Sequence, residues 1–334
     1  MSVVPRTIRA LDRFQQRRAW AGFPFAVVKK YGDDQAGSLA TLIAYYGFFS
    51  AFPLMLVLVS VLGIVLAGNP DLQQRIIDSA LAQFPIVGPT IAEEVNAITG
   101  NVVALTVGIV TALWAGLGVV QAGQQAMNRV WGVPKKDWPN FFTSRLRSLV
   151  MLVLLGAAIL ASTVLSGLAT MGHAGALDRL WQISLSFLLN VVLFLLIYRV
   201  LARLDLRWRD VLPGGLVAAA LWTMLQSLGG LYVSHTIKGA SNVYGTFALV
   251  IGLLVWISLG AQLTLYCAEI NVVRVRGLWP RSLTPPPLTA ADRRVLRDAT
   301  MVERRRPEQH IEVTFDPQER SSETERTSPG PDRT

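Results

Sequence analysis

Six long apolar stretches separated by polar segments dominate the hydrophobic pattern of the chain. They cover about residues 37–68, 102–126, 146–171, 180–199, 213–237 and 244–273. Each reaches the roughly 20 residues that a helix needs to cross the hydrocarbon of a bilayer. The pattern predicts an all-α, polytopic membrane protein, with six transmembrane helices in one domain over residues 37–279.

Three segments lie outside these helices. Residues 1–36 combine apolar side chains with seven Lys/Arg, which is typical of amphipathic helices lying on an anionic membrane surface. Residues 69–101 contain two amphipathic stripes and predict an external hairpin. Residues 280–334 are rich in Pro, Arg, Ser and Glu without apolar periodicity, so we expect a disordered tail.

The distribution of charge predicts the orientation in the membrane. The chain has a net charge of +9, 52% hydrophobic residues and only 16% charged residues. The tail has ten basic and ten acidic residues, so the basic excess lies beside the apolar stretches, as the positive-inside rule expects. A cytoplasmic N-terminus leaves only Arg75, Arg179 and Lys238 outside. We therefore expect both termini in the cytoplasm and no nucleic-acid partner.

The last apolar stretch has a polar face. Ser258, Gln262, Tyr266 and Glu269 recur at steps of three or four, together with small residues such as Gly252, so they share one side of a helix. Leu253 and Trp256 belong to the opposite side, which lipid can cover. The polar face instead needs protein or water as its neighbour.

The first apolar stretch has a proline at its middle, Pro53, after the aromatic pair Tyr45-Tyr46. Proline kinks a membrane helix unless neighbours satisfy the freed carbonyl. The kink either shapes a cavity against the last helix or only helps packing.

Glu269 is the sharpest candidate for chemistry, because ionisable groups in membrane helices usually face a cavity or a partner. It lies about 14 residues past the centre of its stretch, roughly 20 Å at 1.5 Å per residue, near the inner headgroups. Two interpretations remain open. Glu269 either forms a structural pair with Arg199, Arg203 or Arg274, or takes part in gating or proton coupling.

The remaining candidates also allow two interpretations. Asn128 and Gln226 could line a polar passage or form interhelical hydrogen bonds. The basic residues could bind phosphate headgroups or act only as inside anchors: Arg129, Arg199, Arg203 and Arg207. Arg274 belongs with them as an ion-pair candidate.

The sequence lacks the motifs of several common classes of enzyme. Cys267 is the single cysteine and cannot form an intramolecular disulfide. No nucleotide loop, metal-protease motif or nucleophile elbow occurs. We therefore expect no enzyme activity, no catalytic residue, no metal and no cofactor.

Four stretches resemble the YihY/virulence factor BrkB membrane proteins, a family once mislabelled as ribonuclease BN: LIAYYGFFSAFPL at 42–54, AMNRVWG at 126–132, WRDVLPGG at 208–215, and 244–271. One departure is Cys267, where the family pattern has glycine before Ala-Glu. The resemblance implies a six-helix protein of the bacterial inner membrane, with both termini cytoplasmic, and no nuclease activity.

Two functions fit these observations. The first is translocation or handling of a lipid or small solute through a cavity lined by the first and last helices. The second is a membrane scaffold or assembly subunit without transport activity. Membrane lipids are expected partners of either, and a homo-oligomer or a periplasmic or cytoplasmic protein partner stays open.

Overall fold

All regular elements in the described part of the chain are helical. The structure, a computed structural model, describes residues 6–65, 102–169, 176–232 and 238–315, apart from positions 139, 203, 284 and 286. Six described helices have 25–39 residues: α3 (Ala36–Val65), α6 (Val102–Val130), α7 (Phe141–Ala169), α8 (Ala176–Leu201), α9 (Trp208–Tyr232) and α10 (Lys238–Arg276). The predicted all-α class is confirmed, and each predicted apolar stretch overlaps one long helix.

Four shorter helices complete the described elements: α1 (Arg6–Arg17), α2 (Ala19–Asp33), η1 (Lys135–Asp137) and α11 (Ala290–Val302). The expected external hairpin at 69–101 lies outside the described residues.

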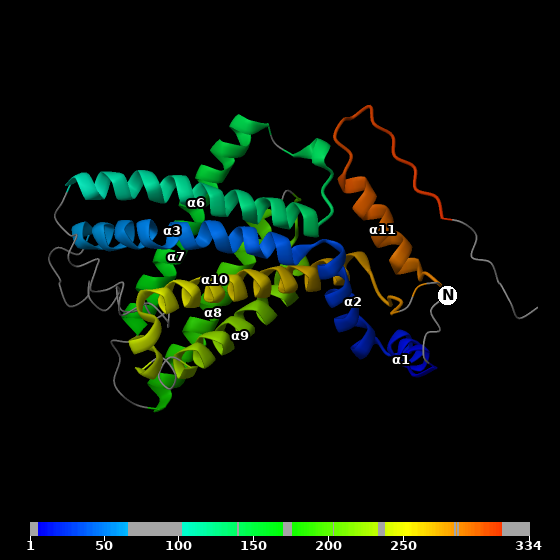
Figure 1. The fold of residues 1–334 in the computed structure, drawn as a ribbon, viewed down its shortest axis with the longest axis horizontal. Helices are drawn as coiled ribbons and strands as arrows, with labels where there is room; N and C mark the ends of the chain where they lie inside the picture. The colour runs from blue at the N-terminus through cyan, green and yellow to red at the C-terminus, as the bar shows by residue number, and fades with distance from the viewer. Residues whose placement is uncertain are drawn as a thin grey trace, which may run out of the picture.

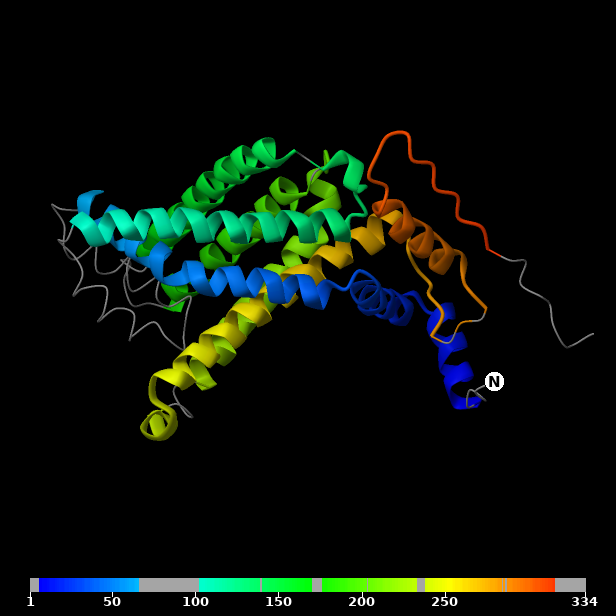
Figure 2. The same ribbon diagram turned by 45° about the horizontal axis from the view of Figure 1, so that its top comes forward.

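The long helices pack as neighbouring pairs. Figure 1 shows α3 and α6 side by side along most of their length, and α10 packs against both α3 and α9. Helix α8 packs against α9 and α7. Helices α1, α2 and α11 gather with the N-terminus at one end of the bundle (Figures 1 and 2).

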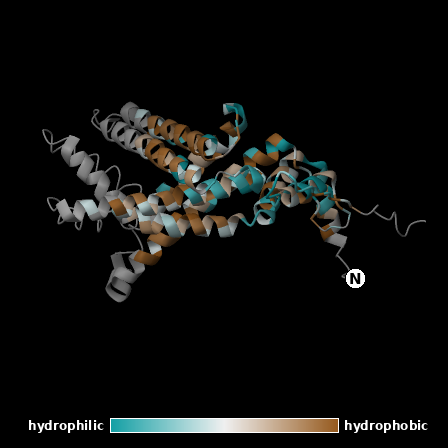
Figure 3. Cartoon of the chain, turned by 90° about the horizontal axis from the view of Figure 1, so that it is seen from above, coloured by the Kyte–Doolittle hydropathy of each residue, from teal (hydrophilic) through white to brown (hydrophobic). Residues whose placement is uncertain are grey.

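Apolar side chains cover much of the bundle's outside. Brown colouring follows the long helices in Figure 3, whereas teal gathers where α1, α2 and α11 lie. Trp114, Val153 and Met224 are all more than half exposed. Residues 183–201, 208–229 and 250–276 are each long and apolar enough to cross a membrane. Because a water-soluble domain rarely exposes so much apolar surface, this arrangement is that of an integral membrane protein.

Helix α9 begins earlier than the predicted start at residue 213. It starts at Trp208, so Pro213 lies inside it. Proline has no N–H to pair with the carbonyl four residues earlier. That carbonyl, on Arg209, instead accepts a hydrogen bond of 3.1 Å from Arg274 on α10. The neighbouring helix therefore supplies the donor that the proline removes.

The prediction of a disordered tail from residue 280 is wrong for residues 281–283 and 287–303. Helix α11 starts with a capping box, in which Thr289 and Asp292 satisfy each other's backbone N–H groups. Ala291, Val295 and Val302 are buried. Charge and proline content suggested disorder, but these apolar side chains share one face and pack against the rest of the chain. Residues 316–334 lie outside the described part.

Gly214 allows α9 and α10 to meet backbone to backbone. Its N–H donates to the Asn271 side chain at 2.7 Å, and a Cβ at this position would lie 2.2 Å from the Cys267 carbonyl oxygen. The family resemblance placed a small residue at position 267. Here Cys267 is buried, and the glycine on the opposite helix provides the close approach.

Gly214→Ala is therefore expected to destabilise the protein. Alanine is usually better than glycine in a helix, but the overlap with backbone should outweigh that gain and cost about 1–3 kcal/mol. Thermal unfolding in detergent measures the change. Gly156→Ala on α7 is the matched control, since no described atom lies within 4 Å of its Cβ position. Equal melting temperatures for the two variants would contradict the close contact.

Candidate functional site

Helix α2 is held against α10 by a pair of stacked tyrosines. The rings of Tyr31 and Tyr266 lie 3.7 Å apart with an angle of 4° between their planes. Ala26 and Val27 on α2 are also buried. The predicted surface segment is thus helical, but α2 packs against the bundle and brings its last turn to the C-terminal half of α10.

Three ionisable side chains meet next to this stack: Lys30, Asp34 and Glu269. We call them the buried triad. Lys30 donates a short hydrogen bond to Asp34, and its Nζ lies 3.6 Å from Glu269 Oε2. Its third neighbour is the Val130 carbonyl at the end of α6, 3.3 Å away. The Lys30 and Asp34 side chains are 6% and 8% exposed, and that of Glu269 is 0% exposed.

Burial governs the electrostatics of the triad. It raises the pKa of Asp34, although the Lys30 ammonium and, less strongly, Arg129 act in the opposite direction. Neither oxygen of Glu269 receives a hydrogen bond from the described residues. Two acidic groups therefore share one ammonium in a site with little access to water, where unbalanced charge is costly.

The structure places a cation beside Glu269, but it is neither of the two described arginines that the sequence suggested as partners. The cation beside it is Lys30 rather than Arg199 or Arg274. Arg199 stacks over the Trp208 ring at 4.2 Å, and Arg274 binds the Arg209 carbonyl. Arg203, the third expected partner, lies outside the described residues. Sequence periodicity could not find Lys30 because it is 239 positions away on another helix.

The polar face of α10 leads to the triad. Gln262 donates to Ser258 at 3.2 Å, and Tyr266 belongs to the tyrosine stack. The opposite face is not left to lipid as expected, because Leu253 and Trp256 are almost fully buried. Neighbouring helices therefore cover the side with Leu253 and Trp256, whereas Ile251, Val255 and Leu259 of α10 stay exposed.

The other candidates lie at varying distances from this site. Asn128 is buried two residues before Val130. Tyr46 packs against Gly118 of α6, whereas Tyr45 is 55% exposed and lies outside the triad. Pro53 lies within α3.

Three of the candidates do not join the triad. Gln226 is half-buried on α9. Arg129 pairs with Glu303 at 3.3 Å, and Arg207 is exposed before α9.

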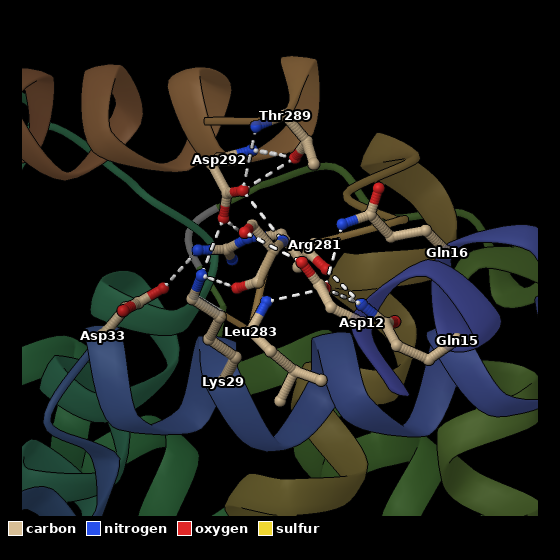
Figure 4. Close-up of polar contacts among 10 residues, drawn as sticks. Asp12, Gln15, Gln16, Lys29, Asp33, Arg281, Leu283, Thr289 and Asp292 are labelled. Carbon is tan, nitrogen blue, oxygen red and sulfur yellow. Dashed lines mark hydrogen bonds and ion pairs between the residues drawn. The ribbon is translucent and has the colours of Figure 1, made fainter. Parts of the chain in front are cut away.

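A second polar cluster joins the two ends of the chain, and we call it the terminal clamp: Asp12, Lys29, Asp33, Arg281 and Asp292 (Figure 4). Arg281 lies at its centre. Its Nε donates to Asp292 at 2.5 Å and its Nη2 to Asp33 at 2.7 Å. Its carbonyl accepts from Gln15 at 2.5 Å.

The N-terminal helices supply the rest of the clamp. Lys29 on α2 donates to Asp292 at 2.9 Å and to the Ser282 carbonyl at 2.6 Å. Asp12 on α1 accepts from the Leu283 N–H at 2.9 Å. Because Lys29 and Lys30 are adjacent, α2 connects the clamp directly to the buried triad.

Asp292 is held as a carboxylate in this clamp. Burial by itself would raise its pKa, but hydrogen bonds from Arg281, the Ser282 backbone and Lys29 hold the pKa well below its usual range. Sequence analysis missed this cluster, although the Thr289-x-x-Asp292 spacing at the start of a helix resembles a capping box and marks α11.

Comparison with known proteins identifies relatives along most of the chain. The model of the family "Virulence factor BrkB" matches residues 27–284. Inner membrane protein YhjD of Escherichia coli is 24% identical over 274 residues, covering 76% of this chain and 81% of its own length. A UPF0761 membrane protein of Pseudomonas paraeruginosa is 27% identical, with 80% and 67% covered. The putative ribonuclease-like protein YfkH of Bacillus subtilis is 24% identical, with 73% and 92% covered.

No solved structure matches the chain. The family match begins within α2 and ends just past Arg281, so it includes the buried triad and all six long helices. The chain belongs to the virulence factor BrkB family of integral membrane proteins.

Proposed function

We propose that this protein translocates a lipid or small solute across the membrane, with a rearrangement where α2 meets α10. The observation that supports the proposal is the buried triad. Replacing a buried ion pair by apolar residues is often neutral or stabilising, so packing alone gives no reason for three buried charged groups. Ionisable residues within membrane-spanning helices, as Glu269 is within the apolar part of α10, instead mark transport or proton pathways in many membrane proteins.

The proposal includes six crossings with both termini in the cytoplasm. Six long helices and the gathering of α1 and α11 at one end support it (Figure 2). The triad would then lie near the inner face of a bacterial inner membrane. The first and last spans, α3 and α10, pack against each other and would line the pathway.

Transport by the reconstituted protein tests the proposal. Liposomes containing the full chain should move fluorescent phospholipid or trapped anionic and cationic solutes faster than empty liposomes. Glu269→Gln removes one acid of the triad and should reduce the rate at least about tenfold, equal to about 1.4 kcal/mol of barrier. Glu303→Gln changes an acid whose side chain is 45% exposed and should leave the rate unchanged. Rates equal to empty liposomes for every cargo would refute the proposal.

The alternative is a membrane scaffold, and the surface of α11 favours it. Arg294, Leu296 and Arg297 are exposed on this helix, where a cytoplasmic protein could bind. A scaffold predicts that Glu269→Gln is silent. It also predicts that Arg294→Glu with Arg297→Glu abolishes the function of the protein in cells without unfolding it. A transporter should tolerate both changes.

A further inference from the structure

The buried triad has an unequal number of acids and bases. Lys30 contributes one positive charge, whereas Asp34 and Glu269 contribute two negative charges when ionised. All three side chains are more than nine-tenths buried. Without a further cation, the site would have a net charge of −1 where charge is poorly solvated.

Charged groups on the surrounding elements are already paired elsewhere. On α2, Lys29 and Asp33 belong to the terminal clamp. On α6, Arg129 lies 3.3 Å from Glu303, a carboxylate that also binds Lys135 at 2.6 Å, and it acts on Asp34 less strongly than Lys30 does. On α10, Arg276 pairs with Asp298 and Arg274 binds a carbonyl. The nearby hydroxyl of Tyr31 is neutral, and burial raises its pKa further. In the described part of the chain, none of these groups forms an ion pair with either acid of the triad.

The hydrogen bonds around Glu269 indicate where the balancing positive charge lies. Neither Glu269 oxygen receives a bond from an N–H or O–H of the described residues, and the Lys30 ammonium is too far away at 3.6 Å. The Asp34 and Glu269 carboxyls both face the Lys30 ammonium, which binds the first and lies 3.6 Å from the second, so the two acids are neighbours. Two carboxylates cannot bond to each other, because an ionised carboxyl only accepts. One proton between them supplies the donor and brings the total charge to zero.

We propose that Asp34 and Glu269 hold one shared proton in the resting protein, and that this pair is the proton-binding site of the transporter. The use of the proton in transport depends on the proposed function, whereas the site itself does not. Release converts the protonated carboxyl to a carboxylate and transfers H⁺ to cytoplasmic water. Uptake reverses this step.

A hinge beside the pair gives the proton a route. Asp34 and Gln35 connect α2 to α3, and Gln35 has a left-handed backbone with φ of 54°, which is unfavourable for a residue other than glycine. A change at Gln35 would swing the last turn of α2 away from α10. That motion separates Asp34 and Lys30 from Glu269 and admits water.

Infrared spectroscopy of the full chain in lipid nanodiscs tests the shared proton. Wild type should show the carbonyl band of a protonated carboxylic acid at neutral pH. Glu269→Gln and Asp34→Asn should each abolish it, because either change leaves one acid balanced by Lys30. Asp33→Asn is the matched control one residue away and should keep the band. Absence of the band in wild type, or its survival in either triad variant, would overturn the proposal.

Stability against pH gives an independent measurement. The pKa of Asp34 is raised in the folded protein, so the stability gained from the bound proton is present at low pH and is lost as pH rises through the folded pKa. Between the ordinary Asp pKa of 3.8 in the unfolded chain and the raised pKa in the folded protein, the unfolding constant of wild type should increase with pH. The increase should reach up to about tenfold per pH unit, the limit for one proton. Asp34→Asn and Glu269→Gln should flatten this slope. If the stability depends on Na⁺ concentration instead of pH, a metal cation and not a proton balances the second acid, and the proposal is wrong.

These measurements separate the two proposals. The band without cargo movement would leave the proton site standing and refute the transport function. Cargo movement without the band would support the transport function and refute the proton site.

Discussion

Lys30→Met should destabilise the protein by about 3–5 kcal/mol at neutral pH, the range for a buried charge that loses its partner. The change removes the only cation in the buried triad and leaves Asp34 and Glu269 without an ammonium. Their side chains are 8% and 0% exposed, so water cannot take the place of Lys30. Denaturant unfolding in mild detergent, followed by tryptophan fluorescence, measures the loss.

The double variant Lys30→Met with Glu269→Gln provides the internal control. Removing one acid together with the base should recover part of the stability, because one carboxyl can then be neutralised by a proton. Lys136→Met is the surface control, since its partner Asp137 is 48% exposed and such pairs contribute about 0–1 kcal/mol. If Lys30→Met proves no worse than Lys136→Met, the triad does not hold α2 against α10.

Arg281→Met is expected to release α11 and α1 from α2. The Arg281 side chain is 2% exposed and pairs with both Asp33 and Asp292, so its loss leaves the buried Asp292 carboxylate with Lys29 as its remaining cation. We expect a cost of about 3–5 kcal/mol. Hydrogen exchange should become much faster in the amides of α1 and α11, with a smaller change in α8 and α9.

Arg281→Lys should rescue little of this loss. One ammonium is a point charge and cannot reproduce the forked contacts of a guanidinium to two carboxylates. Arg305→Met is the control, because Arg305 is 73% exposed and lies 4.0 Å from Glu303. Unchanged exchange in α11 after Arg281→Met would show that apolar packing of α11, and not the clamp, joins the chain ends.

The helices were predictable because their signal is local. A bilayer requires about 20 apolar residues per crossing, and this requirement can be read from any window of the chain. The start of α9 was not predictable in this way. Pro213 is typical of a helix start, but Arg274 on another helix supplies the hydrogen bond that permits five helical residues before it.

In the candidate site, too, the local feature was predictable and the contact between distant segments was not. Glu269 was recognisable as an acid beside a long apolar stretch, and its need for a partner followed from the cost of burying charge. The nearest arginines in the expected topology were the natural candidates. The tyrosine stack instead places α2 on α10, so the partner comes from a basic segment that composition alone describes as a surface anchor.

The amino-acid sequence by itself determined the helical class, the apolar stretches and the membrane character of this protein, since each depends on composition and spacing within one segment. The tertiary structure decided which charges are buried together, that residues 290–302 form a helix, and that Gly214 lets two helices touch. These depend on contacts between residues up to 271 positions apart, such as Asp12 and Leu283. No local pattern encodes such a pairing, because its free energy exists only after the helices have packed.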